Sequence, residues 1–255
     1  MSRFHDVQTF VREANRVTRR EELYGLVDGV VRELDFDYFS LVQHADVAST
    51  PPQDFVHLVS FPKAWREMVM ARGYFADDPV HVACQKTARG FLWSSAGQII
   101  DLTPRQHEIL RAAAAEGLGD GFAVPIHLPG ELGGSCSFGL RLGREASAES
   151  LPMMQYVGCF AFEAARRIMK ADRGRARAAS GPPRLTDRQL DCMVLAAGGG
   201  TDAQIAGRLG ISEKTVHQHV EEAKRRYGVS TRTLLVVRAL FDGQITFADI
   251  FRTLH

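Results

Sequence analysis

The stretch TDAQIAGRLGISEKTVHQHVEEAKRRYGV, residues 201–229, constrains the fold of this chain more than any other segment. Apolar residues recur at helical spacing on both sides of LGIS, which interrupts the pattern. Thr201 with Gln204, and Thr186 with Gln189 upstream, have the spacing of a capping box, in which the Thr caps a helix and the Gln reaches back to it. The sequence therefore predicts a helix-turn-helix unit in an all-α four-helix domain, with helices over 187–197, 202–209, 213–227 and 231–241.

The predicted helix 213–227 has one apolar and one polar face. Val216, Val220, Ala223 and Tyr227 recur at i, i+4, i+7 and i+11, so their face is expected to pack on the domain core. The polar face carries side chains that can donate to or accept from base edges in a major groove, namely Lys214, His217, Gln218, Glu221 and Arg225. A solvated helix face with mixed charges is the alternative interpretation.

The segment KADRGRARAASGPPRLT, residues 170–186, separates this domain from the rest of the chain. It is small, basic and without apolar periodicity, and its Gly and Pro residues favour an exposed linker. We expect one domain over 1–169, a linker over 170–184 and a second domain over 185–255. From Lys170 onward there are 14 Lys and Arg against 9 Asp and Glu, a net charge of +5, which leaves −4 for residues 1–169. The basic C-terminal end points to a polyanionic partner such as double-stranded DNA.

The first 169 residues alternate between helical and strand-like patterns. Amphipathic helices are predicted near 5–17, 20–34, 62–73, 78–88, 103–116 and 149–171. Strand-like runs cover 36–43, 54–61, 90–94, 121–128 and 134–142, and PGELG joins the last two as a hairpin loop. This order predicts an α/β/α sandwich around a mostly antiparallel sheet, and so an α+β class for the whole chain.

Composition excludes several classes of protein. The four cysteines, Cys84, Cys136, Cys159 and Cys192, have no paired spacing, which argues against a zinc ribbon or a disulfide framework and fits a reducing cytoplasm. The N-terminus lacks the apolar core of a signal peptide, and no run approaches the ~20 apolar residues of a membrane span. We therefore expect a cytoplasmic location, no membrane partner, no metal and no cofactor.

The segment FPKAWREMVMARGYFADDPVHVACQKTARGFLW, residues 61–93, contains Trp65, an Asp78-Pro79 pair and Trp93. An indole N–H and a carboxylate are both costly to bury alone. If both face one cavity, they supply a donor and an acceptor for an amphiphilic ligand. The alternative is that the tryptophans are ordinary core residues and that the Asp caps a turn.

The residues from Leu185 to Arg232 resemble the DNA-binding domain of LuxR-type transcription regulators along their whole length, with Gln189 and Arg226 in place of the usual Glu and Lys. The resemblance implies that helix 213–227 enters the major groove and that the next helix helps two copies pair. A homodimer would then read two half-sites of a palindromic site, about one DNA turn apart. The DNA-binding residues that we expect are Thr201, Lys214, Thr215, His217, Gln218, Glu221, Lys224, Arg225 and Arg232.

Residues 61–93 resemble the autoinducer-binding domain of the same quorum-sensing regulators, and so does EGLGDGFAVPIHLPGELGGSCSF, residues 116–138. The likeness therefore spans nearly the whole chain, from about Phe36 to Leu240. It implies that Trp65 donates to the lactone carbonyl of an N-acyl homoserine lactone. Asp78 would accept from the amide N–H, and Trp93 would pack beside the ring. The other residues expected to bind this small-molecule autoinducer are Phe61, Val69, Val80, Ser40, Val42, Ile109, Leu118 and Cys136.

Three departures from the family pattern each remove or weaken a hydroxyl donor. Phe61 and Val69 stand where Tyr is common, and Cys136 stands where a Ser or Thr often faces the acyl carbonyl. An acyl carbonyl buried without a partner costs on the order of 1–3 kcal/mol. We therefore hypothesise weak binding of common acyl homoserine lactones and a preference for a less polar or bulkier signal.

The function expected from the sequence is that of a ligand-responsive DNA-binding transcriptional regulator, not an enzyme. A receptor for a non-lactone or aryl signal and a ligand-independent DNA-binding regulator remain alternatives. His81 and Cys84 beside Asp78 would suit a nucleophile pair or half a metal site, but neither has a third group at suggestive spacing. A phosphorylated receiver domain would need an acidic cluster after an early strand, which is absent. The long helix 149–171 is expected either to pair two copies or to pack on the sheet.

Overall fold

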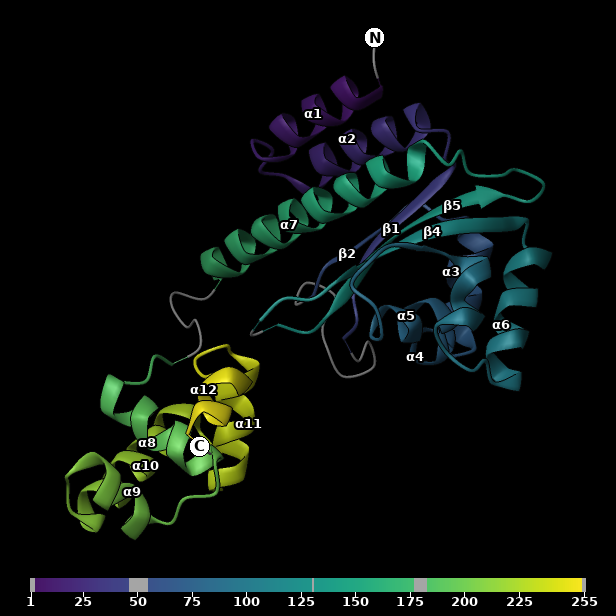
Figure 1. The fold of residues 1–255 in the computed structure, drawn as a ribbon. Coiled ribbons are helices and arrows are strands. Elements are labelled where there is room, and N and C mark those ends of the chain that lie inside the picture. Colours follow the sequence, from purple (N-terminus) through teal and green to yellow (C-terminus); the bar gives the residue numbers. More distant parts are fainter. Residues whose placement is uncertain (1–2, 46–54, 130, 177–182, 254–255) are drawn as a thin grey trace. The chain divides into compact units, whose positions relative to one another are not determined.

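A computed structural model describes residues 3–45, 55–129, 131–176 and 183–253 (Figure 1). The chain divides into two compact units: residues 1–127 and 132–177 form the N-terminal unit, and residues 128–131 and 178–255 form the C-terminal unit. No helix in the described ranges is long and apolar enough to cross a membrane.

The N-terminal unit is built on a five-stranded sheet with the order β2-β1-β5-β4-β3. All four neighbouring pairs are antiparallel, as the sequence predicts. Buried residues follow one another along most of β1, β4 and β5, so both faces of the central part of the sheet are covered. The strands are β1 (Tyr38–Gln43), β2 (His57–Val59), β3 (Phe91–Leu92), β4 (Leu118–Ile126) and β5 (Gly134–Arg141).

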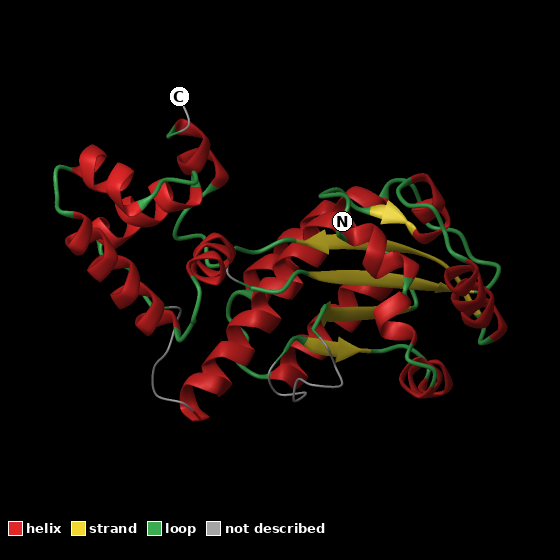
Figure 2. Cartoon of the chain, turned by 90° about the horizontal axis from the view of Figure 1, so that it is seen from below, coloured by secondary structure: helices red, strands yellow, loops and turns green. Residues whose placement is uncertain are grey.

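Helices cover both faces of the sheet and complete the expected three-layer sandwich (Figures 1 and 2). One face packs on α2 (Arg20–Glu33) and the long α7 (Ser150–Ala176), and α1 (Arg3–Ala14) packs on these two helices. The other face packs on α3 (Lys63–Ala71), α4 (Tyr74–Asp77), α5 (Pro79–Cys84) and α6 (Pro104–Ala115). Met154, Val157 and Phe162 of α7 are fully buried, so much of the apolar face of this helix packs within its own unit.

The predicted strand 90–94 contains only the two residues of β3, after which Trp93–Gln98 form a 3-10 helix, η2. Asp120 explains the early end, because its carboxylate accepts hydrogen bonds from the backbone N–H and the hydroxyl of Ser94 at 3.0 and 2.5 Å. Because the backbone N–H of Ser94 donates to this carboxylate, it does not form a hydrogen bond to a neighbouring strand, and the strand ends.

Two segments differ from the prediction at their ends. The predicted linker begins too early, because α7 continues from Lys170 to Ala176. Residues 177–182 of that linker, and Asp54 of the predicted strand 54–61, lie outside the described residues.

The C-terminal unit is helical, with α8 (Asp187–Ala197), α9 (Asp202–Leu209), α10 (Glu213–Tyr227) and α11 (Arg232–Phe241) close to the predicted ranges. Both predicted capping boxes, at Thr186 and Thr201, are present. Gly210 ends α9 with a φ of 65°, a left-handed conformation that favours glycine in the tight turn before α10. A further short helix, α12 (Phe247–Arg252), was not predicted; Thr246 caps it and Ile250 anchors it in the core.

Candidate ligand cavity and nucleic-acid interface

A cavity of about 840 Å³ lies in the N-terminal unit between the sheet and the layer formed by α3 to α6. Its volume is within the range of pockets that enclose small organic ligands. All but one of the residues predicted to bind a ligand line it: Trp65, Asp78, Trp93, Phe61, Val69, Val80, Ser40, Val42, Ile109 and Leu118. Most of these side chains are apolar, so the cavity suits a ligand with a substantial apolar part.

Cys136 is the exception, and its predicted place in the cavity is wrong. Its buried thiol faces α7 and donates a hydrogen bond of 3.0 Å to the carbonyl of Gly158. Successive residues of a strand point to opposite faces, so an error of one residue moves a side chain across the sheet. Ser137, the next residue in β5, lines the cavity directly opposite Ser40 of β1. Two hydroxyl groups therefore lie together on the cavity wall.

Asp78 is held in place by its own helix. It is the N-cap of α5, and its Oδ1 accepts a hydrogen bond of 2.8 Å from the backbone N–H of Val80. Pro79 follows at the first helical position, where the missing N–H costs nothing. Its second carboxylate oxygen, Oδ2, is the atom left to accept from a ligand. Trp65 lies on α3, is nearly buried and packs against Tyr74 with a centroid distance of 6.2 Å.

Trp93 forms another part of the wall, and its neighbours fix its ring closely. A Cβ atom on Gly121 of β4 would lie 2.5 Å from Cε2 of the indole, so only glycine permits this approach. Phe61 packs against the same ring with a centroid distance of 6.0 Å. The buried indole N–H of Trp93 has no hydrogen-bonding partner in the described part of the chain.

Several polar residues of the wall were not predicted: Lys63, Arg66 and Glu67 of α3, His57 of β2, and His81 of α5. Charged side chains beside the apolar face of a helix are usually predicted to be exposed to solvent. The sequence therefore gave no indication that these residues line a cavity. Burial lowers the pKa of His57, and the positive charges of Arg20 and Arg66 lower it further.

The geometry argues against a nucleophilic role for Cys84. Burial raises the pKa of its thiol to about 12, and the negative charge of Asp78 adds to the effect. A thiol that stays protonated is a poor nucleophile. The Nδ1 atom of His81 is bonded to the carbonyl of Phe75 at 3.2 Å. Among the described residues, no group of three or more His, Cys, Asp or Glu side chains is placed to hold a metal ion.

In the C-terminal unit, α10 has the two faces that its sequence predicts. Val216, Val220 and Ala223 are buried in the core of the unit, and Tyr227 packs at its edge. Ser212 caps the helix by accepting from the backbone N–H of Thr215. The side chain of Thr215 is half-buried. The side chains of Lys214, His217, Gln218 and Arg225 are exposed, and that of Glu221 is partly exposed.

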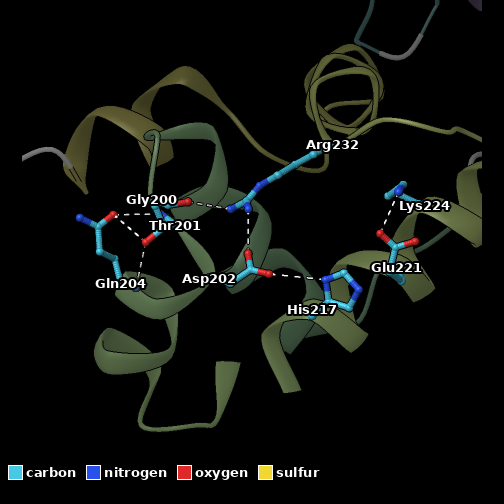
Figure 3. A network of polar contacts seen from close by, with 8 residues as sticks. All are labelled: Gly200, Thr201, Asp202, Gln204, His217, Glu221, Lys224 and Arg232. Atoms are coloured by element: carbon cyan, nitrogen blue, oxygen red, sulfur yellow. Dashed lines mark hydrogen bonds and ion pairs between the residues drawn. The ribbon is translucent and has the colours of Figure 1, made fainter. Parts of the chain in front are cut away.

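A polar network joins α9, α10 and α11 (Figure 3). The guanidinium of Arg232 donates to a carboxylate oxygen of Asp202 and to the carbonyl of Gly200, both at 2.8 Å. The other carboxylate oxygen of Asp202 lies 3.6 Å from Nδ1 of His217. Arg232 was predicted to contact phosphate; the structure gives it bonds within the domain that hold α11 against the start of α9.

Two more of the residues predicted to bind DNA have partners within the domain. The hydroxyl of Thr201 accepts from the N–H of Gln204 as part of its capping box. The ammonium of Lys224 is largely buried and lies 2.8 Å from Glu221. That hydrogen bond lowers the pKa of Glu221, so this carboxylate stays charged on the face of α10.

Comparison with known proteins identifies both units. Residues 19–167 match the autoinducer binding domain, and residues 183–239 match the luxR family of bacterial regulatory proteins. The quorum sensing-dependent transcriptional regulator RpaR of Rhodopseudomonas palustris is 30% identical over 187 residues, covering 72% of this chain and 73% of the relative. The transcriptional activator AhyR of Aeromonas hydrophila is 26% identical over 230 residues, covering 89% of this chain and 87% of AhyR.

Solved structures agree in fold. The crystal structure of Escherichia coli SdiA is similar with a TM-score of 0.69 at 25% identity, covering 94% of this chain and 98% of SdiA. SdiA in complex with octanoyl-rac-glycerol gives a TM-score of 0.70 at 24% identity, covering 96% and 98%. These relatives are transcriptional regulators and not enzymes. The chain therefore belongs to the LuxR-type quorum-sensing regulators, in which an autoinducer-binding domain precedes a helix-turn-helix DNA-binding domain.

Proposed function

We propose that this regulator binds an amphiphilic signal molecule in the 840 Å³ cavity and, as a homodimer, a palindromic DNA site through α10. The observation that supports it most is that Trp65, Asp78 and Trp93 line one cavity in the unit that precedes the helix-turn-helix. A regulator of this kind acts where the DNA is, in the cytoplasm.

The signal that we propose is an N-acyl homoserine lactone or a related acylated molecule. Trp65 would donate to a headgroup carbonyl, and Oδ2 of Asp78 would accept from an amide or hydroxyl group. Ser40 and Ser137 supply hydroxyl groups for an acyl carbonyl, which offsets part of what Phe61 and Val69 lack. We therefore expect standard lactones to bind, although more weakly than a signal whose headgroup uses more of the polar wall.

Double-stranded DNA would bind to the exposed face of α10. Lys214, His217, Gln218 and Arg225 are exposed on the side of α10 opposite its buried face, where they could approach base edges or phosphates. On DNA, Gln218 would exchange its hydrogen bond to Glu222, and His217 its contact with Asp202, for contacts with the nucleic acid. A module of this size buries too little surface for tight specific binding alone. On α11, Leu234, Val237 and Phe241 are exposed apolar side chains at i, i+3 and i+7, and we propose this stripe as the surface that pairs two DNA-binding domains.

Ligand and DNA binding would be coupled by mass action. An empty apolar cavity forfeits contacts for the side chains around it, and a ligand that binds only the folded form stabilises that form. Occupied cavities would raise the concentration of folded dimer available to DNA.

Titration calorimetry and gel shifts on the full chain test this proposal. We expect N-octanoyl homoserine lactone to bind with one site per chain, to raise the melting temperature and to change the affinity for a palindromic DNA fragment. The variant Trp65→Phe, which lacks the indole donor, should lose affinity for the lactone. If no acylated signal binds and DNA affinity is the same with and without added ligand, a ligand-independent DNA-binding regulator is the correct description.

A further inference from the structure

His81 lies on the cavity wall beside Asp78, although no part in ligand binding was predicted for it. Asp78 is the N-cap of α5, and His81 follows three residues later. Side chains three apart on a helix are neighbours, so these two polar groups occupy the same stretch of wall.

Three contacts, two with Phe75 and one with His44, fix the imidazole ring of His81. Its Nδ1 lies 3.2 Å from the carbonyl oxygen of Phe75, and since a carbonyl only accepts, Nδ1 carries the proton. The ring centroid lies 4.7 Å from that of Phe75 and 4.5 Å from that of His44. Because the ring is packed on two sides and bonded at Nδ1, the edge that contains Nε2 is the part left to face the cavity.

The Nε2 atom is available to a ligand. It has no hydrogen-bonding partner in the described part of the chain. It is also not one of the fully buried polar atoms that lack a partner, so its surface is accessible. In the neutral ring, a protonated Nδ1 makes Nε2 an acceptor. Together with Oδ2 of Asp78, the wall beside α5 therefore offers two acceptors, and a headgroup that contacts both needs two donors.

We propose that the preferred signal carries a hydroxyl group on its headgroup, which donates to Nε2 of His81 while a second donor bonds to Asp78. This inference rests on the proposed function. An acyl homoserine lactone offers a single amide N–H, which satisfies one acceptor and leaves the other unpaired. A headgroup of the glycerol-ester type offers two O–H donors. His81 thus acts as a specificity-determining residue, distinguishing ligands by their headgroup and not by their acyl chain.

The test compares two ligands with the same acyl chain, 1-octanoylglycerol and N-octanoyl homoserine lactone, by calorimetry on the full chain in one and the same buffer. The variant His81→Asn keeps an amide donor near the position of Nδ1 but has no atom at that of Nε2. Its matched control, His81→Gln, places an amide oxygen or nitrogen near Nε2. We expect His81→Asn to weaken the glycerol ester about 5- to 10-fold and the lactone less than about 2-fold, and His81→Gln to restore most of the loss.

The ratio of the two affinities within one protein sample is the decisive quantity, because it does not depend on the fraction of the variant that folds. The proposal is supported if the affinity for the glycerol ester, divided by the affinity for the lactone, is lower in His81→Asn than in the unmodified chain. An unchanged ratio, with both ligands weakened equally, overturns it and leaves the proposed function standing. Binding of neither ligand to the unmodified chain overturns both.

Discussion

The carboxylate of Asp78 accepts a hydrogen bond of 2.8 Å from the backbone N–H of Val80, so one side chain both caps α5 and lines the cavity. Loss of an N-cap costs about 1 kcal/mol, and Asn caps about as well as Asp. We therefore expect Asp78→Ala to lower the free energy of unfolding by about that amount and Asp78→Asn to change it little, as measured by denaturant titration.

The variants Asp78→Ala and Asp78→Asn should differ in stability but not in the loss of ligand affinity. If the side-chain oxygen of the new amide in Asp78→Asn caps the helix, the NH₂ group of that amide faces the cavity, where a donor replaces an acceptor. Both variants should then bind N-octanoyl homoserine lactone at least about 10-fold more weakly. Full affinity in Asp78→Asn would show that the carboxylate only caps the helix.

Cys136 and Ser137 are adjacent in β5 but lie on opposite faces of the sheet, which separates their effects. Cys136→Ser keeps a donor for the carbonyl of Gly158, so we expect ligand affinity to stay within about 2-fold. Ser137→Ala removes a hydroxyl from the cavity wall and should weaken a ligand with an acyl carbonyl about 3- to 10-fold, by calorimetry. The opposite ranking would place the thiol, not the hydroxyl, in the binding site.

This pair also marks the limit of what the sequence could predict. Periodicity located the helices and the antiparallel sheet because hydrophobic faces repeat over many residues. In a strand, an error of a single residue places a side chain on the wrong face of the sheet, and a short motif does not fix the strand register that closely. Ser40 was already expected on the cavity side. Residues paired across neighbouring strands lie on the same face of a sheet, so the pairing of β1 with β5 could have suggested Ser137.

Tertiary contacts decided the other differences. The bonds from Asp120 to Ser94 that end β3 join residues 26 positions apart, so no local pattern indicates them. Arg232 was read as a surface cation, but Asp202 and the carbonyl of Gly200 hold it within the domain. His81 was not considered as a ligand-binding residue, because its contact with His44 joins segments that are far apart in the sequence.

Acid should destabilise the N-terminal unit through His44. Burial, with the nearby rings of His81 and His127, lowers the pKa of His44 to about 3. The unfolded chain would bind a proton at this residue near pH 6.5, whereas the folded chain does so only near pH 3. The contribution of His44 to stability is therefore complete above about pH 6.5 and falls as the pH drops toward 3, by up to roughly 5 kcal/mol.

Chemical denaturation at a series of pH values measures this effect. His44→Gln should flatten the loss of stability between pH 6.5 and 4, since its amide can still bond to Ser135, which lies 2.9 Å from Nε2 of His44. His5→Gln is the control, because His5 is exposed on α1 and should leave the slope unchanged. Equal slopes for His44→Gln and the unmodified chain would contradict the assignment.

Arg225 and Arg232 were both expected to contact DNA, and the structure predicts different behaviour for them. Arg225 is exposed on α10, so Arg225→Gln should leave stability unchanged and reduce the slope of log affinity against log salt concentration by about 1 if the arginine binds phosphate. Arg232→Gln breaks the bonds to Asp202 and Gly200 and should lower the free energy of unfolding of the C-terminal unit by about 1–3 kcal/mol. Its salt slope should equal that of the unmodified chain, because the guanidinium acts within the domain. A slope reduced by about 1 at unchanged stability would instead make Arg232 a phosphate contact.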